Sequence, residues 1–234
     1  MDGYQINQKV RYGYAKASYK LGINYDLYRT NNRAIYPLDP ANLVGQILMQ
    51  PVLEVTVAGW LQANKPGNSL WKLVVDGQDS TYPLSVVVKD FLVGPDIFYV
   101  ISKQNQLPVQ GIECNKIVDI IRPYQYSDPG GGGYAGYLPS TSAILMQNVP
   151  CSCLINGKGY RSPSKLPTDT IQPTWIVMIA NLNQVNLRTG DIVVSKGEAS
   201  LFNSGNDPVI ENYVIIANEE TEFGWRLTVS QVLN

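Results

Sequence analysis

The two halves of the chain repeat one order of short segments, and this repetition constrains the fold more than any other feature of the sequence. Residues 47–50 and 144–147 both read Ile-Leu-Met-Gln. Three further matches follow in the same order: 71–75 with 175–179, 89–93 with 190–194, and 98–101 with 212–215. Matches that keep one order along both halves predict two copies of a single structural unit.

Segments rich in β-branched and aromatic residues follow one another in each half, with Gly, Pro, Asn and Asp between them. Such segments are typical of β-strands, and the residues between them are typical of turns. The expected strands are 23–29, 52–61, 70–76, 85–89, 97–102 and 112–122, then 143–155, 175–180, 190–195, 213–217 and 225–232. We therefore expect a mainly β protein with two tandem, related, small antiparallel β-barrel or sandwich domains and a short N-terminal helix.

A stretch rich in Gly, Pro and Tyr lies between the two halves. At its centre are four consecutive glycines, Gly130–Gly133, which neither a helix nor a strand holds well. The expected parts of the chain are an N-terminal helix and docking arm at 1–40, a first β domain at 41–123, a linker or loop at 124–142 and a second β domain at 143–234.

The N-terminal segment has the spacing of an amphipathic helix. Its apolar residues lie three or four positions apart, which places them on one face: Ile6, Val10, Tyr14, Ala17 and Leu21. We expect Gly22 to end this helix in the left-handed conformation. Two roles remain open for the helix, an arm that docks on a neighbouring subunit and a helix that packs on its own domain.

Tyrosines crowd the first forty residues of the chain. A tyrosine has a large apolar body and a polar tip, and it is enriched at protein interfaces. Basic residues accompany these tyrosines and fall mostly off the apolar stripe of the expected helix. The candidate interface residues are Tyr4, Tyr12, Tyr14, Tyr19, Tyr25, Tyr28, Lys9, Lys16 and Lys20.

The residue types present leave little room for catalysis. The chain contains no histidine, which excludes Ser-His and Cys-His nucleophile systems and removes the usual acid–base group near neutral pH. The cysteines Cys114, Cys151 and Cys153 are too few for a four-ligand zinc site, and their odd number argues against a disulfide framework. We expect them to be small apolar core residues, and we predict no catalytic, cofactor or metal site and no enzyme activity.

Two acidic groups remain as candidates for carboxylate chemistry. Asp76 and Asp79 flank a turn, where their side chains are expected to make local hydrogen bonds. Glu219, Glu220 and Glu222 are expected in a solvated hairpin loop. Neither group has the spacing of a calcium-binding loop.

Charge and hydropathy limit the partners of the chain. The net charge is −1 and charged residues make up 16% of the sequence, so no strong field attracts nucleic acid or an anionic membrane. We expect no membrane span and no secretory signal, because no long apolar run is present in the sequence. A surface of low charge suits a protein that packs against other proteins.

Three stretches resemble a family of structural proteins encoded by tailed bacteriophages and prophages: RYGYAKASYKLGINYDLYR at 11–29, DIFYVISKQNQLPVQGIECNKIVDIIRP at 96–123, and LRTGDIVV with YVIIANEETEFGWRLTVSQ at 187–194 and 213–231. The resemblance implies a virion protein that is assembled in the host cytoplasm and binds tail-tube, baseplate or neck subunits. It transfers no active-site residue, and it implies structural roles for the region around Cys114 and for Gly224-Trp225-Arg226.

The resulting expectation is a structural component of the phage tail, in the baseplate hub region at the end of the tail tube. A homo-oligomer is expected, and three chains with two barrels each would present six similar faces to a sixfold ring. One alternative is a neck or head–tail connector. Another is a carbohydrate-binding or cell-wall-acting tail module, which predicts a groove lined by Trp60, Trp71, Trp175 or Trp225.

Overall fold

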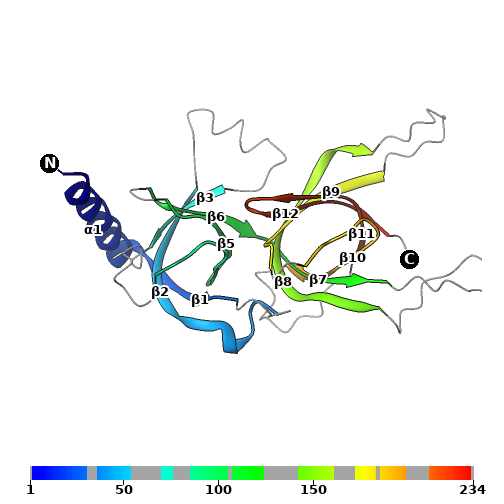
Figure 1. The fold of residues 1–234 in the computed structure, drawn as a ribbon, viewed down its shortest axis with the longest axis horizontal. Coiled ribbons are helices and arrows are strands. Elements are labelled where there is room, and N and C mark those ends of the chain that lie inside the picture. Colours follow the sequence, from blue (N-terminus) through cyan, green and yellow to red (C-terminus); the bar gives the residue numbers. More distant parts are fainter. Residues whose placement is uncertain are drawn as a thin grey trace, which may run out of the picture.

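The computed structural model of the chain describes residues 2–30, 36–53, 70–75, 85–104, 107–123, 142–160, 172–182, 185–198 and 211–232. Within these residues the fold consists of an N-terminal α-helix and two closed antiparallel β-barrels of six strands each. Figure 1 shows the barrels side by side, with the helix at the outer end of the first. The expected fold class, two tandem antiparallel β domains with an N-terminal helix, is confirmed.

Barrel 1 begins directly after the helix α1 (Gly3–Leu21). Its elements are β1 (Ile23–Tyr28), a 3₁₀ turn at Pro40–Asn42, β2 (Leu43–Leu53), β3 (Leu70–Val75), β4 (Phe91–Val93), β5 (Ile97–Ser102) and β6 (Val109–Cys114). The strands follow the order β1-β2-β3-β6-β5-β4 around the barrel.

Barrel 2 repeats this order. Its strands are β7 (Lys116–Arg122), β8 (Ala143–Tyr160), β9 (Gln172–Ile179), β10 (Ile192–Glu198), β11 (Glu211–Thr221) and β12 (Gly224–Gln231). Around the barrel they run β7-β8-β9-β12-β11-β10, so each strand of barrel 1 has a counterpart at the same place in barrel 2. The four segment matches found in the sequence all fall on counterpart strands or on the turns that lead into them.

The division between the barrels differs from the expected domain boundaries. The single strand expected at 112–122 is two strands, β6 and β7, and the chain passes from barrel 1 to barrel 2 at Asn115. Asn115 is held there because its side chain donates to the Cys153 carbonyl oxygen (2.9 Å) and accepts from the Cys153 amide (2.7 Å). Asn115 and Lys116 interrupt the apolar pattern for two residues, and so short a break does not by itself distinguish a bend within one strand from a passage between two barrels. The expected linker lies outside the described residues, except for Ser142.

Three other expectations about the first half are corrected. β1 belongs to barrel 1 and not to a separate N-terminal arm. The expected strand 52–61 is the end of β2, which starts at Leu43, and residues 54–61 lie outside the described part. The segment 85–89 is a turn and not a strand, because the Asp90 carboxylate accepts a hydrogen bond from the Val87 amide (2.7 Å). Asp76 and Asp79 also lie outside the described residues.

Strand pairing gives the register of the counterparts. The match of Trp71 with Trp175 is correct in detail, since each ring packs edge-on against an aromatic ring of the counterpart strand two positions along the sheet, Phe98 of β5 at 5.5 Å and Tyr213 of β11 at 5.1 Å between centroids. Phe98 pairs with Leu92 and Tyr213 pairs with Val193, so the proposed match of 98–101 with 212–215 is displaced by one position.

The Ile-Leu-Met-Gln match is displaced further. Met49 pairs with Val75 of β3, and the residue that pairs with the counterpart Ile179 of β9 is Cys151. Cys151, not Met146, is therefore the counterpart of Met49. The tetrapeptide found the correct strands but the wrong register, which a limited alphabet of strand residues allows.

An arginine–aspartate pair occupies the same place in both barrels. Arg29 donates to both carboxylate oxygens of Asp90 (2.9 and 2.8 Å), and Arg122 does the same to Asp191 (2.8 and 2.8 Å). Each arginine also donates to a carbonyl oxygen of the turn before its aspartate. Both aspartates are buried, with side chains 1% and 2% exposed. Each pair therefore fixes the end of one strand to the turn that precedes another.

Replacing Asp90 with Ala is expected to destabilise the protein by about 2–3 kcal/mol, because a guanidinium that is only partly exposed loses its bidentate partner. Asp96→Ala is the control, since Asp96 is exposed and uses its backbone carbonyl in the turn. Urea unfolding followed by tryptophan fluorescence measures both variants. Equal stability of the two variants would show that the pair does not hold the barrel together.

Gly224 begins β12 at the tip of the β11–β12 hairpin and has φ of +132°. A Cβ atom at this position would collide with the Ile179 carbonyl oxygen of the adjacent strand. Gly224→Ala is therefore expected to cost more than about 2 kcal/mol, from backbone strain and collision together.

Gly190→Ala separates these two effects, because Gly190 has φ of +90° and open space around its Cβ position. Its expected cost is about 1 kcal/mol, from strain alone. Thermal unfolding of the two variants measures the difference, and a larger loss for Gly190→Ala would contradict the assigned collision.

Candidate interaction surfaces

The helix α1 lies on the outside of barrel 1, against β2 and β3. Ser18 is fully buried, and its hydroxyl donates to the Ala15 carbonyl oxygen (2.9 Å). The predicted apolar stripe is only partly used, since Ile6 and Leu21 at its ends are exposed. The helix therefore turns a small, partly polar face to the barrel, which the apolar spacing did not indicate.

Gly22 ends the helix in a different way from the one expected. Its φ of −78° is extended and not left-handed. A Cβ atom at Gly22 would collide with the Ser18 carbonyl oxygen and would press on the Met49 amide of β2. Glycine is required here because the helix end and the barrel wall approach closely.

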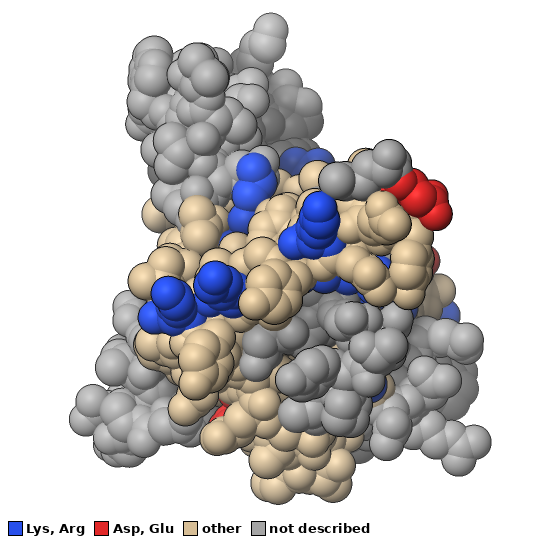
Figure 2. Space-filling view, turned by 90° about the vertical axis from the view of Figure 1, so that its left-hand side faces the viewer, with Lys and Arg blue, Asp and Glu red and all other residues tan. Residues whose placement is uncertain are grey.

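The solvent face of α1 consists of alternating lysines and tyrosines. Lys9, Tyr12, Lys16 and Tyr19 follow at spacings of three or four residues, and Lys20 adjoins them, so they form one stripe on a helix. All five are exposed, and Tyr12 and Tyr19 retain 70% and 77% of their accessible surface. The helix contains no acidic residue. Figure 2 shows lysine and arginine side chains gathered on this end of the molecule. We call this stripe the cationic face of α1.

The remaining candidate interface residues do not share this face. Tyr4 is exposed near the start of α1, and Tyr14 is half-buried. Tyr25 lies inside barrel 1, where burial raises its pKa to about 12. Tyr28 is half-buried against the hydrophobic cluster between the barrels. Alternation along β1 directs Tyr25 inward, so its side chain does not lie on the surface as the interface prediction requires.

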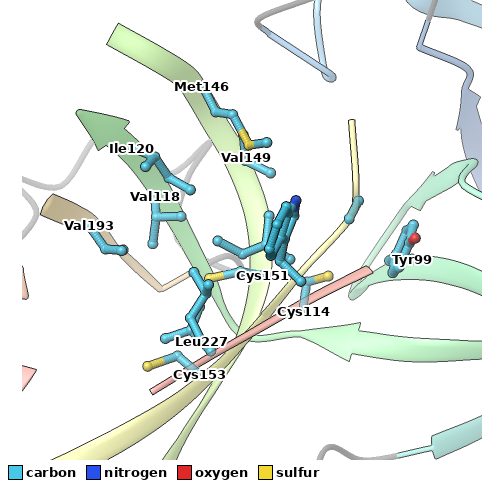
Figure 3. Close-up of a cluster of buried hydrophobic side chains, with 14 of the residues drawn as sticks. Tyr99, Cys114, Val118, Ile120, Met146, Val149, Cys151, Cys153, Val193 and Leu227 are labelled. Atoms are coloured by element: carbon cyan, nitrogen blue, oxygen red, sulfur yellow. The ribbon is translucent and has the colours of Figure 1, made fainter. Parts of the chain in front are cut away.

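Barrel 1 packs on barrel 2 through one outer face of its sheet, which we call the joint face. It consists of buried or half-buried residues that belong to the same cluster as the core of barrel 2: Tyr28, Phe91, Val93, Tyr99 and Cys114. The Tyr99 hydroxyl donates to the Phe223 carbonyl oxygen at the hairpin tip of barrel 2 (2.9 Å). Figure 3 shows Cys114 near Cys151 of barrel 2, with Tyr99 at the side of the same cluster. The joint face of barrel 1 and the interior of barrel 2 therefore form one apolar cluster, which is separate from the interior of barrel 1.

Within the described residues, the counterpart of the joint face on barrel 2 is less deeply buried. Phe91 is paired with Tyr28 and Tyr99, and in the same way Ile192 is paired with Ile121 and Val214. With the neighbouring positions these form an apolar stripe of half-buried or exposed residues, which we call the open face: Ile121, Ile192, Val194, Val214 and Val232. Sequence patterns did not predict this face, because it becomes visible only when the strands of the two barrels are paired.

The described residues provide neither an accessible cysteine nor a metal-binding group. The three cysteines are free and buried, and burial raises the pKa of each thiol, that of Cys153 to about 11. Among the described residues no group of Cys, Asp and Glu could hold a metal ion. Likewise, none of the described helices is long and apolar enough to cross a membrane.

A shallow hollow of about 240 Å³ lies between the barrels, lined in part by Arg29, Lys89, Asp90 and Asn181. The Asp90 carboxylate in this hollow already accepts two hydrogen bonds from the Arg29 guanidinium. The Asp90 carboxylate of the hollow is therefore engaged in the ion pair with Arg29.

The tryptophans within the described residues belong to the hydrophobic clusters. Trp71 packs against the interior of barrel 1, Trp175 packs against the large cluster, and Trp225 is 5% exposed. A groove for a sugar ring requires exposed aromatic faces, which these three residues do not provide. Trp60 lies outside the described residues.

The burial of the cysteines predicts their reactivity. Only thiolates attack alkylating reagents, and burial with a raised pKa keeps all three thiols protonated at pH 8. Iodoacetamide at pH 8 should label none of them in the native protein and all three in urea, as read by intact-mass spectrometry. Rapid labelling of the native chain would place a cysteine outside the core.

No protein-family model matches the chain, and no curated protein matches it. Among solved structures, the phage-like element PBSX protein xkdH of Bacillus subtilis aligns with 50% of this chain and 93% of its own, at 12% identity and a TM-score of 0.28. A TM-score this low carries no argument about fold or function.

Proposed function

We propose that the chain is a structural component of a tailed-phage virion that acts through protein–protein assembly and catalyses no reaction. The observation that carries the proposal is the pair of opposed surfaces. One end of the molecule presents the cationic face of α1, and barrel 2 presents the open face. Apolar stripes that are not fully buried and tyrosine-rich surfaces are typical of protein interfaces.

The joint between the barrels supports this role. A subunit that carries load between neighbours must transmit it without bending at its centre. Here the joint face is buried in one cluster with the core of barrel 2, and the Asn115 side chain is hydrogen-bonded to β8. The two surfaces are therefore held at a fixed separation and angle.

We place this subunit in the baseplate hub region, at the end of the tail tube. Support comes from the sequence resemblance to phage structural proteins and from the two barrels of one strand order. We infer that the barrels arose by duplication, because strand order, the Arg–Asp pairs and the packed tryptophans all correspond. Three such chains would form a homo-oligomer that offers six similar barrels to a sixfold ring.

Cryo-electron microscopy of the parent virion tests the proposal. Density for paired six-stranded barrels at the tail tip, in threefold or sixfold arrangement, is the expected result. Density at the neck would overturn the hub position and retain a structural role. Absence of the protein from purified particles, measured by mass spectrometry, would overturn the structural role itself.

A further inference from the structure

The β11–β12 hairpin presents an acidic tip that complements the cationic face of α1. Glu219, Glu220 and Glu222 are all exposed there. Arg226 is the neighbouring cation, and its contact with Glu219 is long (3.5 Å) and largely exposed to solvent. Arg226 offsets only one of the three carboxylates, so the tip keeps a net negative charge. We call these three glutamates and their turn the acidic tip.

The acidic tip has a fixed shape. The Thr221 hydroxyl donates to the Gly224 carbonyl oxygen (2.7 Å), and the Phe223 carbonyl oxygen accepts from Tyr99 of barrel 1 (2.9 Å). Glu220 accepts from the Asn181 side chain (2.5 Å). A surface held in this way loses little conformational entropy when a partner binds.

The cationic face of α1 has matching properties. Its lysines lie on a helix of 19 residues that contains no acidic side chain, so no carboxylate within the helix neutralises them. Tyr12 and Tyr19 lie between the lysines with most of their surface exposed. On the acidic tip the Phe223 side chain is also exposed, at 38%. Both surfaces therefore combine charge of one sign with aromatic area.

The two surfaces do not meet within one chain. α1 lies against β2 and β3 at the outer end of barrel 1, whereas the acidic tip lies at the joint between the barrels (Figure 1). Since the chain as a whole is nearly neutral, with a net charge of −1, the separation of the two charges creates complementary sites on different copies.

We propose, on the basis of the assembly role above, that the cationic face of α1 docks on the acidic tip of a second copy of this chain. The contact joins different surfaces of the two copies. It is therefore heterologous, and repeating it generates a closed ring or an open filament. Opposite charges set the orientation, and the aromatic residues supply the buried apolar area.

Charge reversal on either side tests this contact. The first variant is the triple change Lys9→Glu, Lys16→Glu and Lys20→Glu, and the second is Glu219→Lys, Glu220→Lys and Glu222→Lys. Each gives two surfaces of like charge and is expected to weaken self-association by at least about tenfold. Sedimentation velocity over a range of concentrations measures the association, and unfolding curves verify that both variants fold.

A mixture of the two variants is the decisive sample. Each variant alone has surfaces of one sign, but the intact helix of one complements the intact tip of the other, so the mixture should recover association. The variant that combines all six substitutions exchanges the signs of both surfaces and should also associate. The control variant Lys9→Arg, Lys16→Arg and Lys20→Arg keeps the charge and should retain association, and added salt should weaken it in the wild type.

Three results would overturn the proposal: a wild-type chain that stays monomeric, reversed variants that associate as well as the wild type, or a mixture that does not recover association. None of these results bears on whether the chain is present in virions. The self-contact and the structural role therefore fail separately.

Discussion

Burial of the joint face of barrel 1 against barrel 2 is the interaction on which the rest of the structure depends. Phe91 and Tyr99 would otherwise present large aromatic surfaces to water on the outside of a small barrel. Because they enter the same cluster as the core of barrel 2, the chain behaves as one elongated body. The positions of α1, the acidic tip and the open face are all consequences of this joint.

Entry into each barrel follows one plan. β6 passes into β7 at Asn115, whose amide donates to the Cys151 carbonyl oxygen (3.0 Å). α1 passes into β1 at Gly22, which approaches the amide of Met49, the counterpart of Cys151. The helix α1 therefore occupies the place before barrel 1 that barrel 1 occupies before barrel 2. The molecule is a directional stack of helix, barrel and barrel, and its far end is the open face.

Sequence patterns predicted the fold class, because alternation and turn residues depend on neighbours in the chain. They also identified Trp71 and Trp175 as counterparts, and they placed the cysteines in the core. They did not find the passage at Asn115, because a break of two polar residues can also occur within one strand. Register was lost because strands use a limited alphabet of residues, so that Met49 was matched with Met146 although strand pairing matches it with Cys151. The clustering of tyrosines indicated α1 as a surface, but only the three-dimensional structure separates exposed Tyr12 from buried Tyr25.

The central claim is that the chain assembles through α1 and through the open face of barrel 2. Hydrogen–deuterium exchange of the isolated chain, compared with the chain in purified particles, tests it most directly. The account predicts slower exchange in particles within α1 and within β7, β10 and β11, which carry the open face, with little change in strands buried at the joint. Equal exchange of these segments in both samples would contradict the account.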